Sequence, residues 1–359
     1  MAESRTNYTV IQALRGIACL WVLLFHAAEG GHLKSLAPLS PFLFADGHLG
    51  VAIFFTLSGF VIAHSLIGRS PADIPIANGA DFGRFLVRRS IRLAPAYWVS
   101  IALAIAFAGF SAMVRHQPHL MPTAGQIAAH VFYLQDLLKI APINLAYWTL
   151  AYEIQFYVFL ALMLLIRAKW TRAGWPLAPW PALAMWALAL ASALGQFGQD
   201  WSGVFVQHWG VFYLGVLARR AVDSEVARLA CLILGAVLLA TPGFDRTAAL
   251  TAILLYLAMR SGWAQGGLNW RWLQFLGAIS YSLYLVHNPL TGAAAFVGHR
   301  LFGDGPAADL ICLVLILAVC IGGATLLWAA VERPSHWLSR RIRANPRTGT
   351  GAPLNPAAV

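Results

Sequence analysis

Apolar runs long enough to cross a membrane recur along the whole chain, and they constrain its fold more than any other feature. A helix of about 20 apolar residues spans the roughly 30 Å hydrocarbon core of a bilayer. Only 11% of the 359 residues are charged, whereas roughly 25% are charged in ordinary soluble domains. We therefore predict an all-α, polytopic membrane protein, a bundle of about ten transmembrane helices near residues 10–28, 49–67, 94–114, 143–166, 181–198, 204–218, 229–241, 247–259, 273–298 and 309–331.

The first apolar run could be mistaken for a cleavable signal peptide, because it is N-terminal and is followed by Ala27 and Ala28. Its apolar core is longer than that of a usual signal peptide, it carries Arg15, and further apolar runs follow it. We expect the first run to be retained as a helix.

The placement of lysine and arginine predicts the orientation of the bundle. With the N-terminus inside, most of these residues fall in inner segments, and the outer loops carry only Lys34, Arg115, Lys139, Arg246 and Arg300. Lysine and arginine favour the cytoplasmic side, so both termini are predicted to be cytoplasmic. The membrane expected for this chain is a cytoplasmic membrane. The net charge of +11 then reflects topology and contact with anionic lipid, and no nucleic-acid partner is expected.

The chain shows no stretch typical of a second domain. Residues 1–337 are predicted to form one transmembrane domain, and residues 338–359, with their glycine, proline and alanine, a disordered cytoplasmic tail. Residues 126–138 are too short and polar to span, so we expect an interfacial or re-entrant helix there. The cysteines lack the spacing of metal ligands or of a disulfide framework, so they are predicted to be packing residues, with no metal site: Cys19, Cys231, Cys312 and Cys320.

Two polar residues bracket the stretch "RGIACLWVLLFH" (15–26) in the first run. An ionisable group at the centre of a membrane helix costs at least about 2.5–3.5 kcal/mol, so each one indicates a functional site. In a helix Arg15 and His26 face the same way, about 16 Å apart along the axis. The predicted orientation puts Arg15 near the inner end and His26 near the outer end. The alternatives are an arginine that reaches the inner headgroups and an interfacial histidine in contact with water.

Arginine pairs also mark the inner end of the third run, in "FLVRRSIRLAPAYW" (85–98). If this stretch is helical, Arg89 and Arg92 share a face at the membrane surface. Guanidinium groups placed in this way can bind phosphates through two hydrogen bonds each. The alternative is an arginine cluster that binds lipid headgroups.

Carboxyl groups appear in two further runs. Glu153 lies near the middle of the fourth run, where a carboxylate must pair, accept hydrogen bonds or stay protonated. A structural ion pair with an arginine is the alternative to a functional role. Glu332 lies at the inner end of the last run, where the alternative is helix termination with Arg333 as its partner.

The remaining candidates lie on two other runs. His287 precedes Pro289, and a proline within a helix frees a backbone carbonyl. Ser58 belongs to the glycine-rich stretch "GHLGVAIFFTLSGF" (47–60), which would allow close backbone approach or the passage of a ligand beside it.

Taken together and in order, these motifs resemble the integral-membrane acyltransferase-3 family, which includes O-acetylases of bacterial surface polysaccharides. The likeness extends from about residue 10 to residue 337. The matching stretches are "LRGIACLWVLLFH" (14–26), "GVAIFFTLSGF" (50–60), the RxxR from Arg89 to Arg92, "WTLAYEIQFY" (148–157), "ISYSLYLVHNP" (279–289) and "ERP" (332–334).

The resemblance implies a membrane-bound O-acyltransferase in the inner membrane of a bacterium. It would move an acyl group, with acetyl as the expected one, from cytoplasmic acyl-CoA to a hydroxyl of a carbohydrate or glycolipid-like acceptor. Acyl-CoA would be a co-substrate, and no permanently bound cofactor is expected. The implied roles are His26 as general base, Glu153 and His287 as further catalytic residues, Arg89, Arg92, Arg15 and Ser58 in co-substrate binding, and Glu332 and Trp148 as other functional residues.

Two departures and two alternatives qualify this interpretation. Ala52 and Ala151 stand where many family members have an acidic residue and a serine, so no role is expected at those positions.

The mechanism could instead pass through an acyl group on His26. The rival function is a transporter or flippase for a lipid-linked sugar, and the lack of internal repeats weighs against it. The oligomeric state is not predicted.

Overall fold

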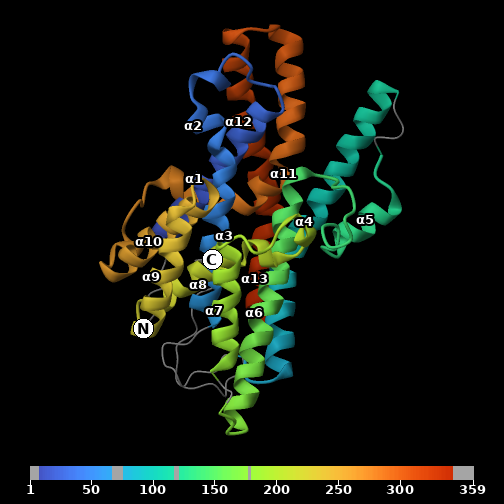
Figure 1. Cartoon of the computed structure of the whole chain (residues 1–359). Helices are drawn as coiled ribbons and strands as arrows, with labels where there is room; N and C mark the ends of the chain where they lie inside the picture. Colours follow the sequence, from blue (N-terminus) through green and yellow to red (C-terminus); the bar gives the residue numbers. More distant parts are fainter. Residues whose placement is uncertain (1–7, 67–75, 117–120, 177–178, 343–359) are drawn as a thin grey trace, which may run out of the picture.

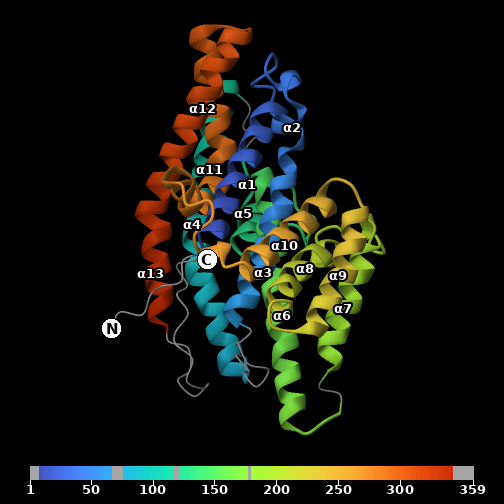
Figure 2. The same ribbon diagram turned by 90° about the vertical axis from the view of Figure 1, so that its left-hand side faces the viewer.

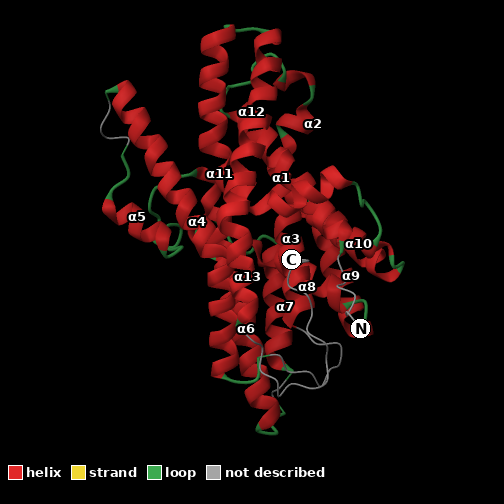
Figure 3. Cartoon of the chain, turned by 180° about the vertical axis from the view of Figure 1, so that it is seen from behind, coloured by secondary structure: helices red, strands yellow, loops and turns green. Residues whose placement is uncertain are grey.

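The computed structural model describes residues 8–66, 76–116, 121–176 and 179–342. Over these ranges every regular element is helical (Figures 1 and 3), which confirms the all-α prediction for the described part of the chain. Each predicted apolar run coincides with a helix: α1 (Thr9–Glu29), α3 (Gly50–Leu66), α4 (Gly79–Arg115), α6 (Trp148–Arg172), α7 (Trp180–Ala193), α8 (Trp209–Arg220), α9 (Glu225–Ala240), α10 (Phe244–Arg260), α11 (Arg271–Phe302) and α12 (Pro306–Leu327).

These helices differ in their ability to cross a bilayer. Five segments of the described chain are long and apolar enough to span: Thr9–Glu29, Asp46–Leu66, Gly79–Met113, Leu145–Arg172 and Pro306–Arg341. By contrast, α8 has 12 residues, and at 1.5 Å per residue it covers about 18 Å of a core that is about 30 Å thick. The count of ten spanning helices and the orientation of the termini therefore stay predictions.

Two helix hairpins extend from the bundle at opposite ends (Figure 2). The hairpin of α11 and α12 rises at one end, and the hairpin of α6 and α7 extends at the other. Between them, α1 lies along α11 and α3 along α8. The elements of the site come from the long helices of this middle region.

Glycines set the closest helix crossings. A Cβ atom on Gly277 of α11 would lie 2.1 Å from the carbonyl oxygen of Gln12 on α1, and one on Gly59 of α3 would lie 1.9 Å from that of Phe212 on α8. Gly215 of α8 packs as closely against the backbone of α3. Any larger residue at these positions would push the helices apart, so glycine is what allows the backbones to touch.

The chain turns back toward the middle of α4 after that helix ends. The short helix α5 (Ala124–Val131) begins at Thr123, which forms a capping box with Gln126. The indole N–H of Trp98, half-way along α4, donates to the Val131 carbonyl at 3.2 Å. The helix predicted for 126–138 thus ends at Val131 and is followed by turns. Its end lies beside the middle of α4, and whether it is re-entrant or interfacial stays a prediction.

The last apolar helix changes register before it ends. Through the π-helical turn η8 (Trp328–Glu332), α12 continues into α13 (Arg333–Arg341). Pro334 has no N–H to donate to Ala330, and the wider register immediately precedes it. Residues 338–341, predicted as the start of the tail, are helical, and residues 343–359 lie outside the described residues. The cysteines lie within helices: Cys19, Cys312 and Cys320 are buried and Cys231 is half-buried.

Candidate functional site

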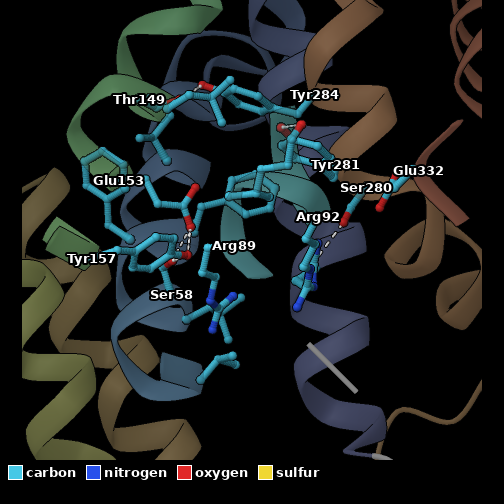
Figure 4. Close-up of a pocket in the computed structure, with 18 of the residues that line it drawn as sticks. Ser58, Arg89, Arg92, Thr149, Glu153, Tyr157, Ser280, Tyr281, Tyr284 and Glu332 are labelled. Carbon is cyan, nitrogen blue, oxygen red and sulfur yellow. Dashed lines mark hydrogen bonds between the residues drawn. The ribbon is translucent and has the colours of Figure 1, made fainter. Parts of the chain in front are cut away.

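A cavity opens between α1, α3, α4, α6 and α11, and the end of η8 and the start of α13 close its wall (Figure 4). Its empty volume, including the open mouth, is about 830 Å³. Apolar side chains of α3, among them Val51 and Phe54, form part of the lining. The polar lining is largely made of the residues that the sequence singled out, together with some that it did not: Arg15, Ser58, Arg89, Arg92, Thr149, Glu153, Tyr157, Ser280, Tyr281, Tyr284, Glu332 and His336.

Two hydroxyl groups hold the carboxyl group of Glu153. Ser58 and Tyr157 both donate to its Oε1 atom, and the two hydroxyl oxygens lie 2.7 Å apart. Among the described residues no ion pair within 4.0 Å includes Glu153. Glu153 is therefore held by two hydroxyl groups, and these contacts do not show the alternative of a structural ion pair with an arginine.

The guanidinium groups of Arg89 and Arg92 reach the cavity from one face of α4, as their spacing predicts. Arg89 lies over the ring of Tyr157, 4.9 Å from its centroid. Arg92 is only 8% exposed, and its Nε atom has no hydrogen-bond partner in the described part of the chain. Arg15 approaches from α1 and donates to the Ser280 hydroxyl at 3.2 Å. Partly unpaired guanidinium groups at a cavity are suited to an anionic ligand.

Glu332 lies on the opposite side of the cavity from Glu153 (Figure 4). Its Oε2 atom accepts hydrogen bonds from the backbone N–H and the hydroxyl of Ser282, at 3.2 and 2.5 Å. Its Oε1 atom is 3.7 Å from Nε2 of His336. Arg333, the alternative partner, lies instead over the ring of Trp328, so Glu332 is held within the site.

His26 and His287 form a separate pair toward the other end of α1. Their ring centroids are 5.1 Å apart. Nδ1 of His287 donates to the Tyr284 carbonyl at 2.7 Å, and its buried Nε2 atom has no partner among the described residues. Nδ1 of His26 donates to the Glu29 carboxylate at 3.0 Å, and no hydrogen bond within the described ranges uses its Nε2 atom. Both histidines therefore keep one ring nitrogen for a ligand.

Tyr284 connects the cavity with the histidine pair. It lines the cavity, and its ring centroid is 5.7 Å from that of His287. Its hydroxyl accepts a hydrogen bond from Thr149 at 2.9 Å. Ser280, Tyr284 and His287 are spaced four and three residues apart, so one face of α11 carries all three.

Pro289 frees a carbonyl as predicted, and the structure shows which one. A proline cannot donate to the residue four positions earlier, which is Leu285. The Nδ2 atom of Asn144 approaches that carbonyl oxygen at 3.5 Å, and Asn288 donates to the Oδ1 atom of Asn144 at 3.1 Å. These contacts hold the turn before α6 against α11, beside the histidine pair.

The predicted site residues thus fall into three places. The cavity brings Arg15, Ser58, Arg89, Arg92, Glu153 and Glu332 together, the pair joins His26 with His287, and Trp148 lines a second pocket. Glu153, predicted to be catalytic, has its hydrogen-bond partners in the cavity, whereas Glu29 holds His26.

Sequence reasoning missed Glu29, Tyr157 and His336. Each has a signal in the spacing, because residues three or four apart meet on a helix. Glu29 follows His26 by three positions, Tyr157 follows Glu153 by four, and His336 follows Glu332 by four. An intramembrane charge is therefore a reason to look one turn further along its helix.

A helical bundle with several membrane-length apolar helices and a polar, arginine-lined cavity, as the described residues show, defines an integral-membrane protein with an internal ligand site. The acyltransferase-3 family model, described as an acyltransferase domain, matches residues 8–328. The chain belongs to this family and is an acyltransferase. This membership favours the enzyme over the alternative of a transporter or flippase.

Individual relatives support the same assignment. The chain is 28% identical over 346 residues to the exopolysaccharide production protein ExoZ of Rhizobium meliloti (strain 1021), covering 90% of this chain and 96% of the relative. It is 30% identical over 233 residues to nodulation protein 10 of Rhizobium leguminosarum bv. viciae, covering 60% and 59%. It is 28% identical over 184 residues to the peptidoglycan O-acetyltransferase OatA of Listeria monocytogenes, covering 46% and 26%. No solved structure matches the chain.

Proposed function

We propose that this acyltransferase moves an acyl group, acetyl in the simplest case, from cytoplasmic acyl-CoA to a hydroxyl of a polysaccharide or glycolipid on the other side of the membrane. The names of two relatives, an exopolysaccharide production protein and a peptidoglycan O-acetyltransferase, support a carbohydrate acceptor. The observation that carries the proposal is the continuous contact from the arginine-lined cavity through Tyr284 to His287 and His26.

The cavity would hold the donor. Coenzyme A carries several phosphate groups, and Arg89, Arg92 and Arg15 offer guanidinium groups that can bind them through paired hydrogen bonds. The apolar wall on α3 would pack against the pantetheine arm. The thioester would then lie near Tyr284, at the end of the cavity that meets the histidine pair.

His26 would act as the general base. The Glu29 carboxylate accepts the Nδ1–H of His26, which leaves the Nε2 lone pair to take a proton. The acceptor hydroxyl gives its proton to Nε2 while its oxygen bonds to the thioester carbonyl carbon. The tetrahedral intermediate then breaks its C–S bond, and the leaving thiolate takes the proton back from the imidazolium. His287, in contact with His26, offers its unpaired Nε2 atom as a hydrogen-bond acceptor.

The alternative mechanism places the acyl group on His26 before the acceptor arrives. It requires that the enzyme exchange labelled CoA into acyl-CoA without any acceptor. An exchange rate at the level of a protein-free control supports direct transfer. An exchange rate equal to turnover supports the acyl-enzyme.

The function itself is tested with the full chain in lipid nanodiscs, radiolabelled acetyl-CoA and surface polysaccharide from cells that lack the protein. The expected result is label on the polysaccharide that mild base releases, because base cleaves O-esters. Label that remains entirely in acetyl-CoA with every acceptor fraction would contradict the proposal.

A further inference from the structure

A second pocket lies beside the first, on the side that the charge distribution predicts to be external. Its walls come from the turns after α5, the start of α6 and the loop before α8, and Trp148 and Tyr152 line it. The two pockets are neighbours, because the Trp148 ring of the second lies 5.9 Å, between centroids, from the Phe55 ring of the main cavity. None of the residues that line the second pocket belongs to the proposed acyl-CoA site or to the histidine pair.

The walls of this pocket are fixed by close backbone contacts. Gly203 adopts a φ of +91°, and a Cβ atom there would lie 2.1 Å from the Asp136 carbonyl oxygen. The Gly203 N–H donates to the Tyr152 hydroxyl at 2.7 Å. Gln155 holds the same loop with both ends of its amide, donating to the Gly203 carbonyl and accepting from the Phe205 N–H, each at 3.0 Å. A pocket held in this way is largely formed before a ligand arrives.

The turn that supplies the second wall is held in an uncommon conformation. Tyr133 and Lys139 have φ values of 59° and 53°, in the left-handed region that side chains rarely adopt. The ring of Tyr133 stacks on Tyr97 of α4 with 4.5 Å between centroids, which anchors one end of the turn. Uncommon backbone angles of this kind cluster at binding and catalytic sites.

Two buried oxygen atoms in this turn have no hydrogen-bond donor. Gln135 is 1% exposed, and its Nε2 atom donates toward the Tyr147 carbonyl at 3.4 Å, yet its Oε1 atom has no partner in the described structure. The Oδ2 atom of Asp136 also has no hydrogen-bond partner in the described structure. Burial raises the pKa of this carboxyl group. Both residues line the pocket. Buried acceptors without donors are rare in native proteins, and the hydroxyl groups of a ligand in this pocket would satisfy both.

The rings of Trp148 and Tyr152 supply the complementary surface. Their centroids are 5.5 Å apart and the rings are nearly perpendicular, at 89°. A pyranose ring carries hydroxyl donors around its edge and C–H groups on its faces. The C–H face of such a sugar packs against the negative face of an aromatic ring, while its hydroxyls can donate to Gln135 and Asp136.

We propose that this pocket binds a pyranose ring of the acceptor chain, adjacent to the sugar that is acylated. The inference rests on the proposed function only in taking the acceptor to be a carbohydrate. The position of the pocket supports a site for the acceptor. Trp148 is followed by Thr149, and Thr149 donates to the hydroxyl of Tyr284, which lies beside His287. A sugar held at Trp148 would keep the next hydroxyl of the chain near the histidine pair.

Binding is measured without turnover, by saturation-transfer NMR on the full-length protein in nanodiscs. The probes are cellopentaose and maltopentaose, and sorbitol serves as a polyol that has no ring. At least one pentasaccharide should bind, with the strongest saturation on its ring C–H protons. Failure of both pentasaccharides to bind, or equal binding of sorbitol, would overturn the proposal.

Variants then locate the bound sugar. Trp148→Ala should weaken pentasaccharide binding about tenfold or more, and Trp148→Phe, which keeps a ring, should weaken it about threefold or less. Gln135→Leu combined with Asp136→Asn should weaken it about tenfold through lost hydrogen bonds. Asp200→Asn, an exposed change in the adjoining loop outside the pocket, should leave binding unchanged. Unchanged affinity in the Gln135/Asp136 double variant would overturn the proposal even if Trp148→Ala fails to fold.

The two proposals fail in different ways. If the wild-type protein binds the pentasaccharide but transfers no label from acetyl-CoA to any acceptor, the proposed function is wrong and the sugar pocket stands. If it transfers label and the pocket variants keep the wild-type KM for the polysaccharide and the wild-type Kd for the pentasaccharide, the pocket assignment alone is wrong.

Discussion

The arginine-lined cavity and the histidine pair are built on the same two helices, yet their polar groups are arranged differently. Near one end, Arg15 of α1 donates to Ser280 of α11, and further along the same helices His26 packs against His287. The cavity gathers several guanidinium groups around a large open volume, whereas the pair offers two imidazole nitrogens in a small space. The first arrangement can hold a polyanionic cosubstrate, and the second can move a single proton. Variants at one end should therefore change donor affinity, and variants at the other should change turnover.

The largest effect is expected at the histidine pair. His26→Ala removes the proposed base, and general base catalysis contributes about 100-fold to 10,000-fold, so kcat should fall at least 100-fold while the KM for acyl-CoA stays near that of the wild type. His48→Ala is the matched control, because His48 is exposed near Phe25 and forms no hydrogen bond, ion pair or ring contact with His26 among the described residues. A His26→Ala enzyme with most of its turnover would remove this residue from the centre of the mechanism.

Variants in the cavity should change the KM for acyl-CoA rather than kcat. Hydrogen bonds to charged groups contribute about 1.5–3 kcal/mol each, so Arg89→Ala combined with Arg92→Ala should raise the KM for acyl-CoA by about 100-fold or more. Arg88→Ala serves as control, since Arg88 is on the same helix but does not line the cavity. An unchanged KM in the double variant would return the pair to the alternative of a lipid-binding cluster.

Tyr284, which touches both regions, should affect both parameters. Tyr284→Phe removes the hydroxyl that accepts from Thr149, and a neutral hydrogen bond contributes about 0.5–1.5 kcal/mol. We expect changes of about twofold to tenfold in both kcat and the KM for acyl-CoA. The hydroxyl of Tyr281 donates to the Leu93 carbonyl in the cavity, so Tyr281→Phe should change the KM for acyl-CoA alone. If Tyr284→Phe alters only one parameter, the two regions are not joined at this residue.

Glu29 should give the smallest effect. Its side chain is 53% exposed, and exposed ion pairs contribute about 0.2–1 kcal/mol, so Glu29→Gln should lower kcat about fivefold at most. Glu225→Gln tests the same change in another exposed pair three residues apart, with Arg228, and should have no effect on kcat. A loss of kcat as large as that of His26→Ala would assign Glu29 a more direct role than orienting the ring.

The sequence predicted the members of the cavity better than their partners. Polar residues in apolar runs are costly wherever they lie, so Arg15, Glu153 and Glu332 are conspicuous without any structure. Which groups meet them depends on how helices cross, and that depends on glycine contacts between distant parts of the chain, such as Gly277 against Gln12. For this reason the sequence predicted Glu153 and His287 as catalytic residues beside His26, whereas in the structure His287 and Glu29 contact His26 and Glu153 is held by Ser58 and Tyr157.

The number of spanning helices stays a prediction, because apolar composition and helix length disagree for some of the runs. A run such as 204–218 is apolar enough to be drawn as a span, but the structure gives it a helix of 12 residues, α8. Hydropathy reports burial, whether in lipid or against other helices, and much of α8 is buried against α3 and its neighbours. The second pocket was missed for a related reason, because its walls are turns that only the fold brings together.

In the proposed function the donor enters on the arginine side of the membrane and the acceptor is acylated on the histidine side. This arrangement is tested most directly with proteoliposomes of known orientation, by sealing labelled acetyl-CoA in one compartment and supplying polysaccharide in the other. Labelled polysaccharide is expected when acetyl-CoA is on the side of Arg89 and the polysaccharide is on the side of His26. Transfer only when both substrates share one compartment would contradict it.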